Sequence, residues 1–224
     1  MSARSTDLEL LDVETPPRPV LKRVAGFLAF INRWFGGTAA VAAELGQMSG
    51  VVSVLDVGAG AADIPLALAR RFAGLKPIAM DLSPAMLSLA AGLPRLRGDA
   101  LRLPFRDGSI DVVVATHLFH HLKDDQIVAA LLEFDRVARR GIIVNDLLRR
   151  RRAVLWISLL SLWANPYSRF DGPLSVKRGF TLAEVDALAR RTGLTWLFTR
   201  ERFGHRFTLA GSREPRPAAS GTCA

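Results

Sequence analysis

The chain has 224 residues, half of them apolar and 23% charged, so it is long enough to bury one hydrophobic core without disulfides or metal ions. Its formal net charge of +9 raises nucleic-acid binding as a hypothesis, because basic surfaces bind phosphates without regard to sequence. Arginine is distributed along the whole chain, however, and the sequence contains no aromatic-basic RNA-binding string and no zinc knuckle. Composition therefore argues against a specific nucleic-acid partner.

The two ends of the sequence differ in composition from the part between them. Residues 1–19 are polar and carry three prolines, which predicts a flexible arm without the features of a secretory signal. Residues 212–224 are rich in Pro, Ala, Ser and Gly and predict a disordered tail. The single cysteine, Cys223, lies in that tail, so we expect no disulfide framework and a cytoplasmic location.

Residues 20–50 predict a helical cap ahead of the main domain. Apolar side chains recur there at helical spacing, which predicts an amphipathic helix over 20–35 that covers one side of a cleft. The positions concerned are Leu21, Val24, Phe27, Leu28, Ile31, Trp34 and Phe35.

A buried strand, a glycine-rich turn and a helix follow over residues 51–72. Residues 51–57 are apolar and β-branched, as in a central strand of a parallel sheet, and residues 64–72 have helical spacing. Gly58 and Gly60 allow the backbone to approach a ligand at the carboxyl end of the strand. Asp56 and Asp63 flank this turn and would repel a pyrophosphate, whereas they suit a ligand with a cationic amino group and a sulfonium.

This acidic-x-Gly-x-Gly turn resembles motif I of the class I S-adenosylmethionine (SAM) methyltransferases. The chain departs from the family pattern at Ala62, where many members have a third glycine. The resemblance is close over residues 51–144 and points to the small-molecule and quinone-biosynthesis branch of the family. For the turn taken alone, a structural role in another α/β protein is the alternative.

Two further stretches continue the resemblance. Residues 75–80 predict a strand that ends at Asp81, about twenty residues after the turn, where a carboxylate meets ribose hydroxyls in nucleotide-binding folds. A helix-entry cap is the alternative role for Asp81, because Ser83 and Pro84 begin a helix there. Residues 98–105 and 107–114 are similar to the family's Gly-Asp-Ala, Leu-Pro-Phe and Phe-Asp-Val-Val pattern.

The resemblance also implies which residues contact the cofactor. Asp99 would accept a hydrogen bond from the adenine amino group and the Ala100 amide would face a ring nitrogen, with a surface-turn aspartate as the alternative for Asp99. The implied cofactor is SAM, and the implied contacts are Asp56, Gly58, Gly60, Asp81, Leu82, Asp99, Ala100 and Thr116.

Strand and helix patterns alternate along residues 51–211 and predict an α/β fold, a Rossmann-like, doubly wound sheet of seven strands with helices on both faces. We expect the sheet to be mostly parallel, with an antiparallel C-terminal strand. This SAM-binding domain is expected to contain a lid insertion at 147–180, with an inserted helix after the fifth strand. The expected strands span 51–57, 75–81, 94–98, 110–115, 141–146, 194–201 and 206–210.

Three histidines follow the fourth predicted strand, where the acceptor approaches the methyl group. In a helix, His117, His120 and His121 would share one face. A general base for a phenol is the functional interpretation, with His117 first and His120 second, and it would contribute ~10²–10⁴ in rate. Capping of strand or helix ends is the structural alternative. We expect no metal, because neither glutamate nor cysteine accompanies the histidines.

Residues 149–164 combine a run of four arginines with an apolar helix. Such a helix of about twelve residues is about 18 Å long, whereas a bilayer span needs roughly 20 residues. It is predicted to cap the active site, or to line a lipophilic pocket while the arginines meet anionic lipid headgroups, and the two roles are compatible. Residues 165–173 are predicted as a loop that offers Tyr167 or Arg169 to the acceptor.

The predicted function is SAM-dependent methylation of a small lipophilic acceptor, with O-methylation of a phenolic or polyketide-like ring favoured. The family's amino N-methyltransferases tend to carry Asn/Asp-Pro-Pro-Tyr/Phe after the fourth strand, where this chain has Ala-Thr-His-Leu at 115–118. Three alternatives stay open, namely C-methylation of a quinone or polyketide ring, a non-catalytic SAM-binding partner protein, and RNA methylation. Peripheral membrane contact through 149–164 is a further expectation, and the oligomeric state is left open.

Overall fold

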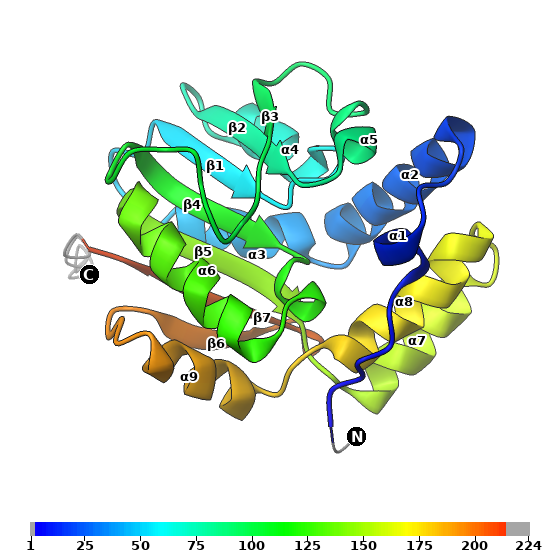
Figure 1. The fold of residues 1–224 in the computed structure, drawn as a ribbon. Helices are drawn as coiled ribbons and strands as arrows, with labels where there is room; N and C mark the ends of the chain where they lie inside the picture. The colour runs from blue at the N-terminus through cyan, green and yellow to red at the C-terminus, as the bar shows by residue number, and fades with distance from the viewer. Residues whose placement is uncertain (1–2, 214–224) are drawn as a thin grey trace, which may run out of the picture.

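The computed structural model describes residues 3–213, which form one seven-stranded sheet with helices on both faces and at one end (Figure 1). The strands are β1 (Ser53–Val57), β2 (Lys76–Asp81), β3 (Arg95–Arg97), β4 (Ile110–Thr116), β5 (Ala138–Leu147), β6 (Phe198–Arg202) and β7 (Arg206–Ser212). Their order in the sheet is β3-β2-β1-β4-β5-β7-β6. The first five strands pair in parallel, β7 runs antiparallel to β5, and β6 runs antiparallel to β7.

Helices cover both faces of this sheet. On one face lie α3 (Gly37–Leu45) and α4 (Asp63–Arg71), and on the other lie α6 (Asp124–Val137) and α9 (Leu182–Arg191). The short helix α5 (Pro84–Leu87) packs beside β2 and β3. Every residue of β4 is buried, which explains why the central strands are apolar on both sides.

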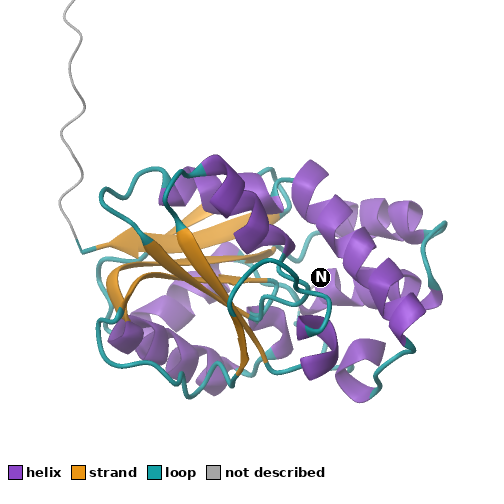
Figure 2. Ribbon diagram, turned by 90° about the horizontal axis from the view of Figure 1, so that it is seen from above, coloured by secondary structure: helices purple, strands orange, loops and turns teal. Residues whose placement is uncertain are grey.

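A helical cap lies beyond the carboxyl ends of the parallel strands (Figure 2). The helix α2 (Arg18–Trp34) contacts α3, α4 and α8 (Pro166–Arg178), and α7 (Arg151–Ser161) packs along α8. The short helix α1 (Leu10–Val13) also contacts α8, and so does η1 (Phe119–His121), the single 3₁₀ turn after β4. The cap therefore encloses the edge of the sheet at which open α/β folds bind ligands.

The predicted fold class is confirmed. The strands expected at 194–201 and 206–210 are the antiparallel pair that completes the sheet, although β6 begins only at Phe198. The fifth strand is longer than expected, because β5 extends from Ala138 to Leu147 to pair with β4 on one side and β7 on the other.

Residues 3–17, called the N-terminal strap below, pack on the cap, where the sequence predicts a flexible arm over 1–19. The Arg4 guanidinium carbon lies 4.0 Å from the centre of the Phe180 ring, and Glu9 is buried. The Leu10 amide donates to Asp171 Oδ1 at 2.7 Å, across 161 residues of sequence. The polar residues of the strap meet partners far along the chain, and local composition does not show such contacts.

The stretch 165–173, predicted as a loop, is the cap and first two turns of α8. The Asn165 side chain accepts a hydrogen bond from the Ser168 amide at 3.1 Å, and Pro166 stands at the start of the helix, where its missing N–H costs nothing. The loop prediction is wrong because a proline in that position begins a helix instead of breaking one. Tyr167 and Arg169 accordingly lie in the first turn of α8.

Two expectations concern the ends of the chain and the membrane. The tail predicted over 212–224, which includes Cys223, lies outside the described residues from 214 onward. Within residues 3–213, no helix is both long and apolar enough to cross a bilayer.

Candidate functional site

The glycine turn after β1 leaves room for a ligand at the edge of the sheet. Gly58 and Gly60 have φ angles of +75° and +54°, a left-handed conformation that favours glycine. A Cβ atom at Gly58 would lie 3.2 Å from a methyl carbon of Leu118, and one at Gly60 would lie 3.2 Å from the terminal carbon of Met86. Any larger side chain would therefore crowd the space that the turn borders.

Three carboxylates surround this turn. Burial raises the pKa of Asp56 well above its usual range, and the nearby Asp63 and Asp81 raise it further. The Asp56 Oδ1 atom is buried and has no hydrogen-bond partner among the described residues. Asp81 accepts hydrogen bonds from the Gly60 amide at 2.7 Å and from the Ser83 amide at 2.8 Å. A cationic ligand would relieve the repulsion among these three groups.

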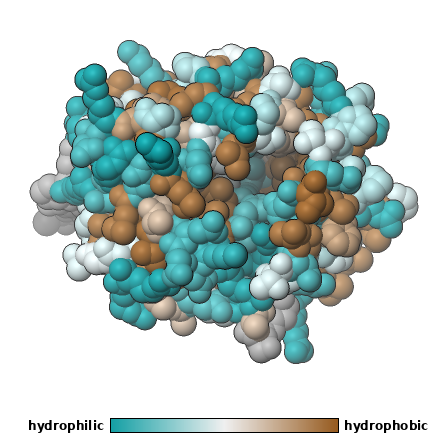
Figure 3. Space-filling model, viewed as in Figure 1, coloured by the Kyte–Doolittle hydropathy of each residue, from teal (hydrophilic) through white to brown (hydrophobic). Residues whose placement is uncertain are grey.

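The other residues implied as cofactor contacts lie along the same edge, because β3, β2, β1 and β4 are neighbours in the sheet. Leu82 follows β2 and is exposed, and Thr116 ends β4 with its buried Oγ1 unpaired within residues 3–213. Asp99 is exposed after β3, and its Oδ1 accepts from the Leu101 amide at 2.9 Å, as in a surface turn. Ala100 is half-buried beside it. Figure 3 shows a hollow over this edge, bordered by hydrophobic residues on the side of α1 and α8.

Comparison with known proteins agrees with this geometry. The methyltransferase domain family matches residues 55–144. Over these residues the chain is therefore similar to a methyltransferase domain. A solved SAM-dependent methyltransferase from Aquifex aeolicus has the same fold, with a TM-score of 0.62 and 19% identity over 88% of this chain and 99% of that chain.

Curated relatives match the central part of the methyltransferase domain. The demethylmenaquinone methyltransferase of Mycolicibacterium gilvum is 38% identical over 97 residues, which are 42% of this chain and 41% of that protein. The ajmaline N-methyltransferase of Rauvolfia serpentina is 30% identical over 99 residues, 40% of this chain and 33% of that protein. The chain thus spans less than half the length of the curated relatives it matches.

SAM is the cofactor of this methyltransferase family, and the residues at the sheet edge fit it. Human N-acetylserotonin methyltransferase, solved in complex with SAM, has a similar fold, with a TM-score of 0.65 and 16% identity over 88% of this chain and 56% of that chain. The unpaired Asp56 Oδ1 and Thr116 Oγ1 atoms and the narrow glycine turn are the features here that favour a ligand at this place. The individual cofactor contacts stay predictions.

His117 directly follows β4, and its ring accepts a hydrogen bond from a buried arginine. Its backbone φ is +55°, and its Nε2 atom lies 2.7 Å from Arg206 Nη1 and 3.1 Å from Asn32 Oδ1. Because a guanidinium can only donate, Nε2 accepts from Arg206 and the imidazole proton resides on Nδ1. Burial and the Arg206 charge lower the pKa of His117 well below its usual range, so the ring is neutral.

η1 is one 3₁₀ turn and not the helix considered for these residues, and the His120 ring meets the His117 ring edge to face, with their centres 6.0 Å apart. The Nδ1 atom of His120 lies 2.7 Å from Asp146 Oδ1, and its Nε2 atom lies 3.6 Å from Glu9 Oε1. His121 Nδ1 lies 2.9 Å from Asp12 Oδ1. In the fold, Glu9 thus stands beside these histidines, although no glutamate accompanies them in the sequence.

Sequence reasoning missed two residues that contact His117. The Arg206 side chain is fully buried at the start of β7, donates to the Phe35 carbonyl at 2.9 Å, and has its pKa lowered to about 10 by burial. The Asn32 side-chain nitrogen donates to Asp63 Oδ2 at 3.0 Å, and its Oδ1 atom lies beside His117 Nε2 as a contact without a hydrogen bond, because both of those atoms are acceptors. A buried polar residue on the apolar face of the helix predicted at 20–35 was the available signal for Asn32.

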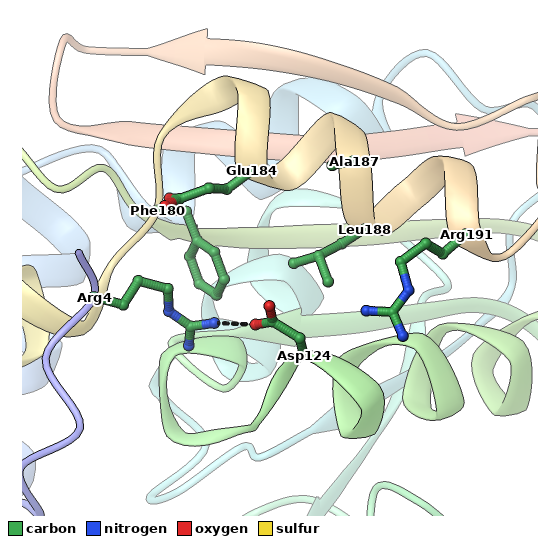
Figure 4. A pocket seen from close by; sticks show the side chains of 7 residues that line it. All are labelled: Arg4, Asp124, Phe180, Glu184, Ala187, Leu188 and Arg191. Carbon is green, nitrogen blue, oxygen red and sulfur yellow. Dashed lines mark hydrogen bonds and ion pairs between the residues drawn. The ribbon is translucent and has the colours of Figure 1, made fainter. Parts of the chain in front are cut away.

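A small pocket lies on the surface between the strap, α6 and α9, away from the cofactor edge (Figure 4). Arg4 enters it from the strap and pairs with Asp124 at 2.7 Å, while Phe180 and Leu188 form an apolar wall. No residue predicted for the cofactor or for catalysis lines it. The pocket is therefore not the candidate site.

Proposed function

We propose that the protein transfers the methyl group of SAM to a small lipophilic acceptor, with a phenolic oxygen as the favoured position. The trio of carboxylates around the glycine turn carries this proposal, together with the family match over 55–144. When bound, SAM supplies an electrophilic methyl group on a cationic sulfonium. Asp81 would bind the ribose and Asp99 the adenine amino group, while Asp56 and Asp63 would lie nearest the positive charge.

Alignment is the main contribution that we propose for the protein. The acceptor oxygen, after losing its proton to water, would take the methyl group as the carbon–sulfur bond breaks and S-adenosylhomocysteine leaves, with charge dispersed in the transition state. The cap formed by α2, α7 and α8 would exclude water and hold the acceptor in line. Effective molarities of ~10⁵ M or more are attainable from such positioning.

We propose His117 as the residue that faces the acceptor oxygen, with His120 as the second candidate. The Arg206 charge opposes proton uptake by His117, so a hydrogen bond from its Nδ1–H to the developing phenolate suits it better than the role of general base. His120 has the Asp-paired geometry of a base, but its Nε2 faces Glu9 of the strap. As a base, His120 would need the strap to lift.

Turnover with a panel of phenols and quinols tests both assignments. We expect His117→Gln to lower kcat at least tenfold with the affinity for S-adenosylhomocysteine unchanged, and the loss to shrink as the pH approaches the phenol pKa near 10. His205→Gln, a histidine in the turn before β7, is the matched control. An unchanged kcat in His117→Gln together with a loss in His120→Gln would move the role to His120. No transfer to any acceptor by a chain that binds S-adenosylhomocysteine would favour a non-catalytic partner protein.

Product analysis decides the atom that is methylated. The names of the demethylmenaquinone methyltransferases favour a ring carbon, which is the alternative to the phenolic oxygen. The two products differ in one observation, because O-methylation removes an exchangeable hydroxyl proton and C-methylation removes a ring proton. Proton NMR of the product therefore separates the two proposals.

We also propose that the cap contacts an anionic membrane surface, from which a lipophilic acceptor would enter. Large apolar side chains on α7, on α8 and in the turn between them are exposed, with Trp163 in that turn at 94% and Trp156 on α7 at 64%. Arg151 and Arg152 are exposed at the start of α7. Arg149 and Arg150 instead form ion pairs with Glu184 and Glu201, so only half of the four-arginine run faces solvent. Exposed aromatic rings beside basic residues suit a headgroup layer.

Flotation with vesicles tests this contact. We expect salt-sensitive flotation with vesicles that contain phosphatidylserine, and a loss of most of it in the Trp156→Ser, Trp163→Ser double variant. Phe198→Ser, at an exposed phenylalanine on β6, is the matched control and should float as the wild type does. Absence of flotation by the wild type would remove the membrane proposal and leave the methyltransferase proposal intact.

A further inference from the structure

The strap brings a glutamate to two adjacent histidines. Glu9 Oε1 lies 3.6 Å from His120 Nε2, and Glu9 Oε2 lies 4.0 Å from His121 Nε2. The three ligand atoms lie within 4.8 Å of one another, and the two imidazole centres are 4.2 Å apart. Glu9 and His120 are buried, whereas the His121 side chain is 30% exposed, which leaves one open side.

The other nitrogen of each ring identifies which atoms carry protons. His120 Nδ1 faces Asp146 at 2.7 Å, and Asp146 also accepts from the amides of Phe119 and Leu147 at 2.8 and 2.7 Å. His121 Nδ1 faces Asp12 at 2.9 Å, and Asp12 also accepts from Arg178 at 2.6 Å. Both aspartates act as acceptors, so Nδ1 of each neutral ring carries the proton. The lone pairs on the two Nε2 atoms therefore converge on Glu9.

Three groups that each offer a lone pair face one another here, and a cation between them would stabilise that arrangement, although Glu9 Oε1 also accepts from Ser175 Oγ at 2.8 Å. Both Nε2-to-carboxylate distances exceed hydrogen-bond length, and a proton on Glu9 would serve only one of the two rings. Adjacent ligand atoms around a tetrahedral zinc ion lie about 3.4 Å apart, given zinc–ligand distances of ~2.0–2.1 Å. The 3.6 Å separation at His120 is close to that value, whereas the 4.0 Å separation at His121, to the other Glu9 oxygen, is longer and would shorten on binding an ion. An imidazole whose other nitrogen donates to a carboxylate is also the usual form of a metal-binding histidine.

We propose that Glu9, His120 and His121 bind a divalent cation of the zinc class, which fastens the N-terminal strap to η1. Four carboxylates lie in this region, those of Glu9, Asp12, Asp146 and Asp171. The Arg178 guanidinium lies among them, 3.9 Å from Glu9. The excess of negative charge favours a cation there. Two imidazoles and one carboxylate leave a fourth position for water on the exposed side of His121.

A second group of possible ligands nearby is a poorer site. His117, His120 and Asp146 also offer atoms within 4.8 Å of one another. The Nε2 lone pair of His117 is already taken by the Arg206 guanidinium at 2.7 Å, and that positive charge would repel a metal ion. The geometry therefore selects Glu9 and His121 as the partners of His120.

Calorimetry with Zn²⁺ on the full chain, free of any affinity tag and previously treated with chelator, tests the site. We expect one ion per chain, with the affinity lowered at least tenfold in Glu9→Gln and in His121→Gln, and roughly 10–100-fold in Asp12→Asn through its hold on His121. Cys223→Ser and His205→Gln are controls for other zinc ligands and should bind as the wild type does. No saturable binding at one ion per chain, or equal affinity in Glu9→Gln and His121→Gln, would overturn the proposal.

Hydrogen exchange gives a second measurement that does not depend on catalysis. We expect Zn²⁺ to slow exchange of the strap amides in the wild type and not in His121→Gln, because only the wild type would tie Glu9 to η1. Unchanged exchange in the wild type at saturating Zn²⁺ would show that no ion fastens the strap. The affinity for S-adenosylhomocysteine, measured on the same variants, should stay unchanged, so failure of the metal site is distinguishable from failure of the methyltransferase proposal.

Discussion

The cofactor edge and the N-terminal strap both place carboxylates around a site, but they are assembled over different distances in sequence. At the cofactor edge, Asp81 holds the Gly60 and Ser83 amides, which are 21 and 2 residues away. In the strap, Leu10 and Asp12 reach Asp171 and His121 across 161 and 109 residues. The first site is thus part of the sheet itself. The second exists only when the strap meets residues far along the chain, and we expect the strap to detach without unfolding of the sheet.

The largest expected effect comes from breaking the short-range site. Asp81→Ala should weaken binding of S-adenosylhomocysteine by about 1–3 kcal/mol, because the ribose hydroxyls and the turn would lose one anionic acceptor. Calorimetry measures the loss, with Asp107→Ala on the exposed loop before β4 as control. Unchanged affinity in a folded Asp81→Ala chain would contradict the assignment of the ribose to this edge.

The next effect tests the sheet that carries the cofactor edge. Despite its burial, Asp111 has its pKa held well below 3.8 by Arg139 and by the amides of Ser53 and Val52, which donate at 2.9 Å. The ionised Asp111 side chain therefore contributes its full stabilisation to the folded state above pH ~4, and this contribution is lost as the pH falls through the lower pKa of the folded state. Asp111→Asn should cost about 1–2 kcal/mol of unfolding free energy at pH 7. In urea unfolding, the difference in unfolding free energy between Asp111→Asn and the wild type should shrink below pH ~4. A difference that does not change with pH would contradict the negative charge assigned to Asp111.

A smaller effect is expected when the long-range site is broken. Asp171→Ala removes the acceptor of the Leu10 and Leu11 amides and should raise the exchange rate of strap amides, while global stability falls by about 1 kcal/mol or less. Hydrogen exchange with mass spectrometry measures both quantities. Equal loss of protection in the strap and in β4 would show that the strap and the sheet unfold together, which would contradict detachment of the strap alone.

The smallest effect concerns the turn beside the cofactor. Ala62 has a φ of +64°, a conformation that costs an alanine ~1–2 kcal/mol of stability. A glycine would avoid that strain, but it would cost about 0.4–1 kcal/mol because its unfolded chain has more conformational freedom. Ala62→Gly should therefore raise stability by up to ~1 kcal/mol, or about 2–4 °C in Tm. Ala59→Gly, in the same turn without a positive φ, should lower Tm and is the matched control.

The sequence predicted the cofactor edge better than it predicted the N-terminal strap. The turn with Gly58 and Gly60 and the strand ending at Asp81 depend on neighbours in sequence, and the local residue pattern together with the family resemblance predicted them. The partners of His120 are Asp146 and Glu9, 26 and 111 residues away, and no local pattern connects them. The strap, for which the sequence predicts a flexible arm, makes contacts of this long-range kind. The start of α8 differs, because its cap from Asn165 to the Ser168 amide is local and Pro166 begins the helix there.

The long reach of the strap has a consequence for synthesis of the protein. The Leu10 amide is made early, but its acceptor Asp171 follows 161 residues later. At ~5–20 residues per second, the strap waits about 8–30 s on the ribosome before its partner emerges. During that interval the Leu10 and Leu11 amides stay without their acceptor, and the strap is open to chaperones and proteases. Any ligand that holds Glu9 against η1 would therefore act at the last step of folding.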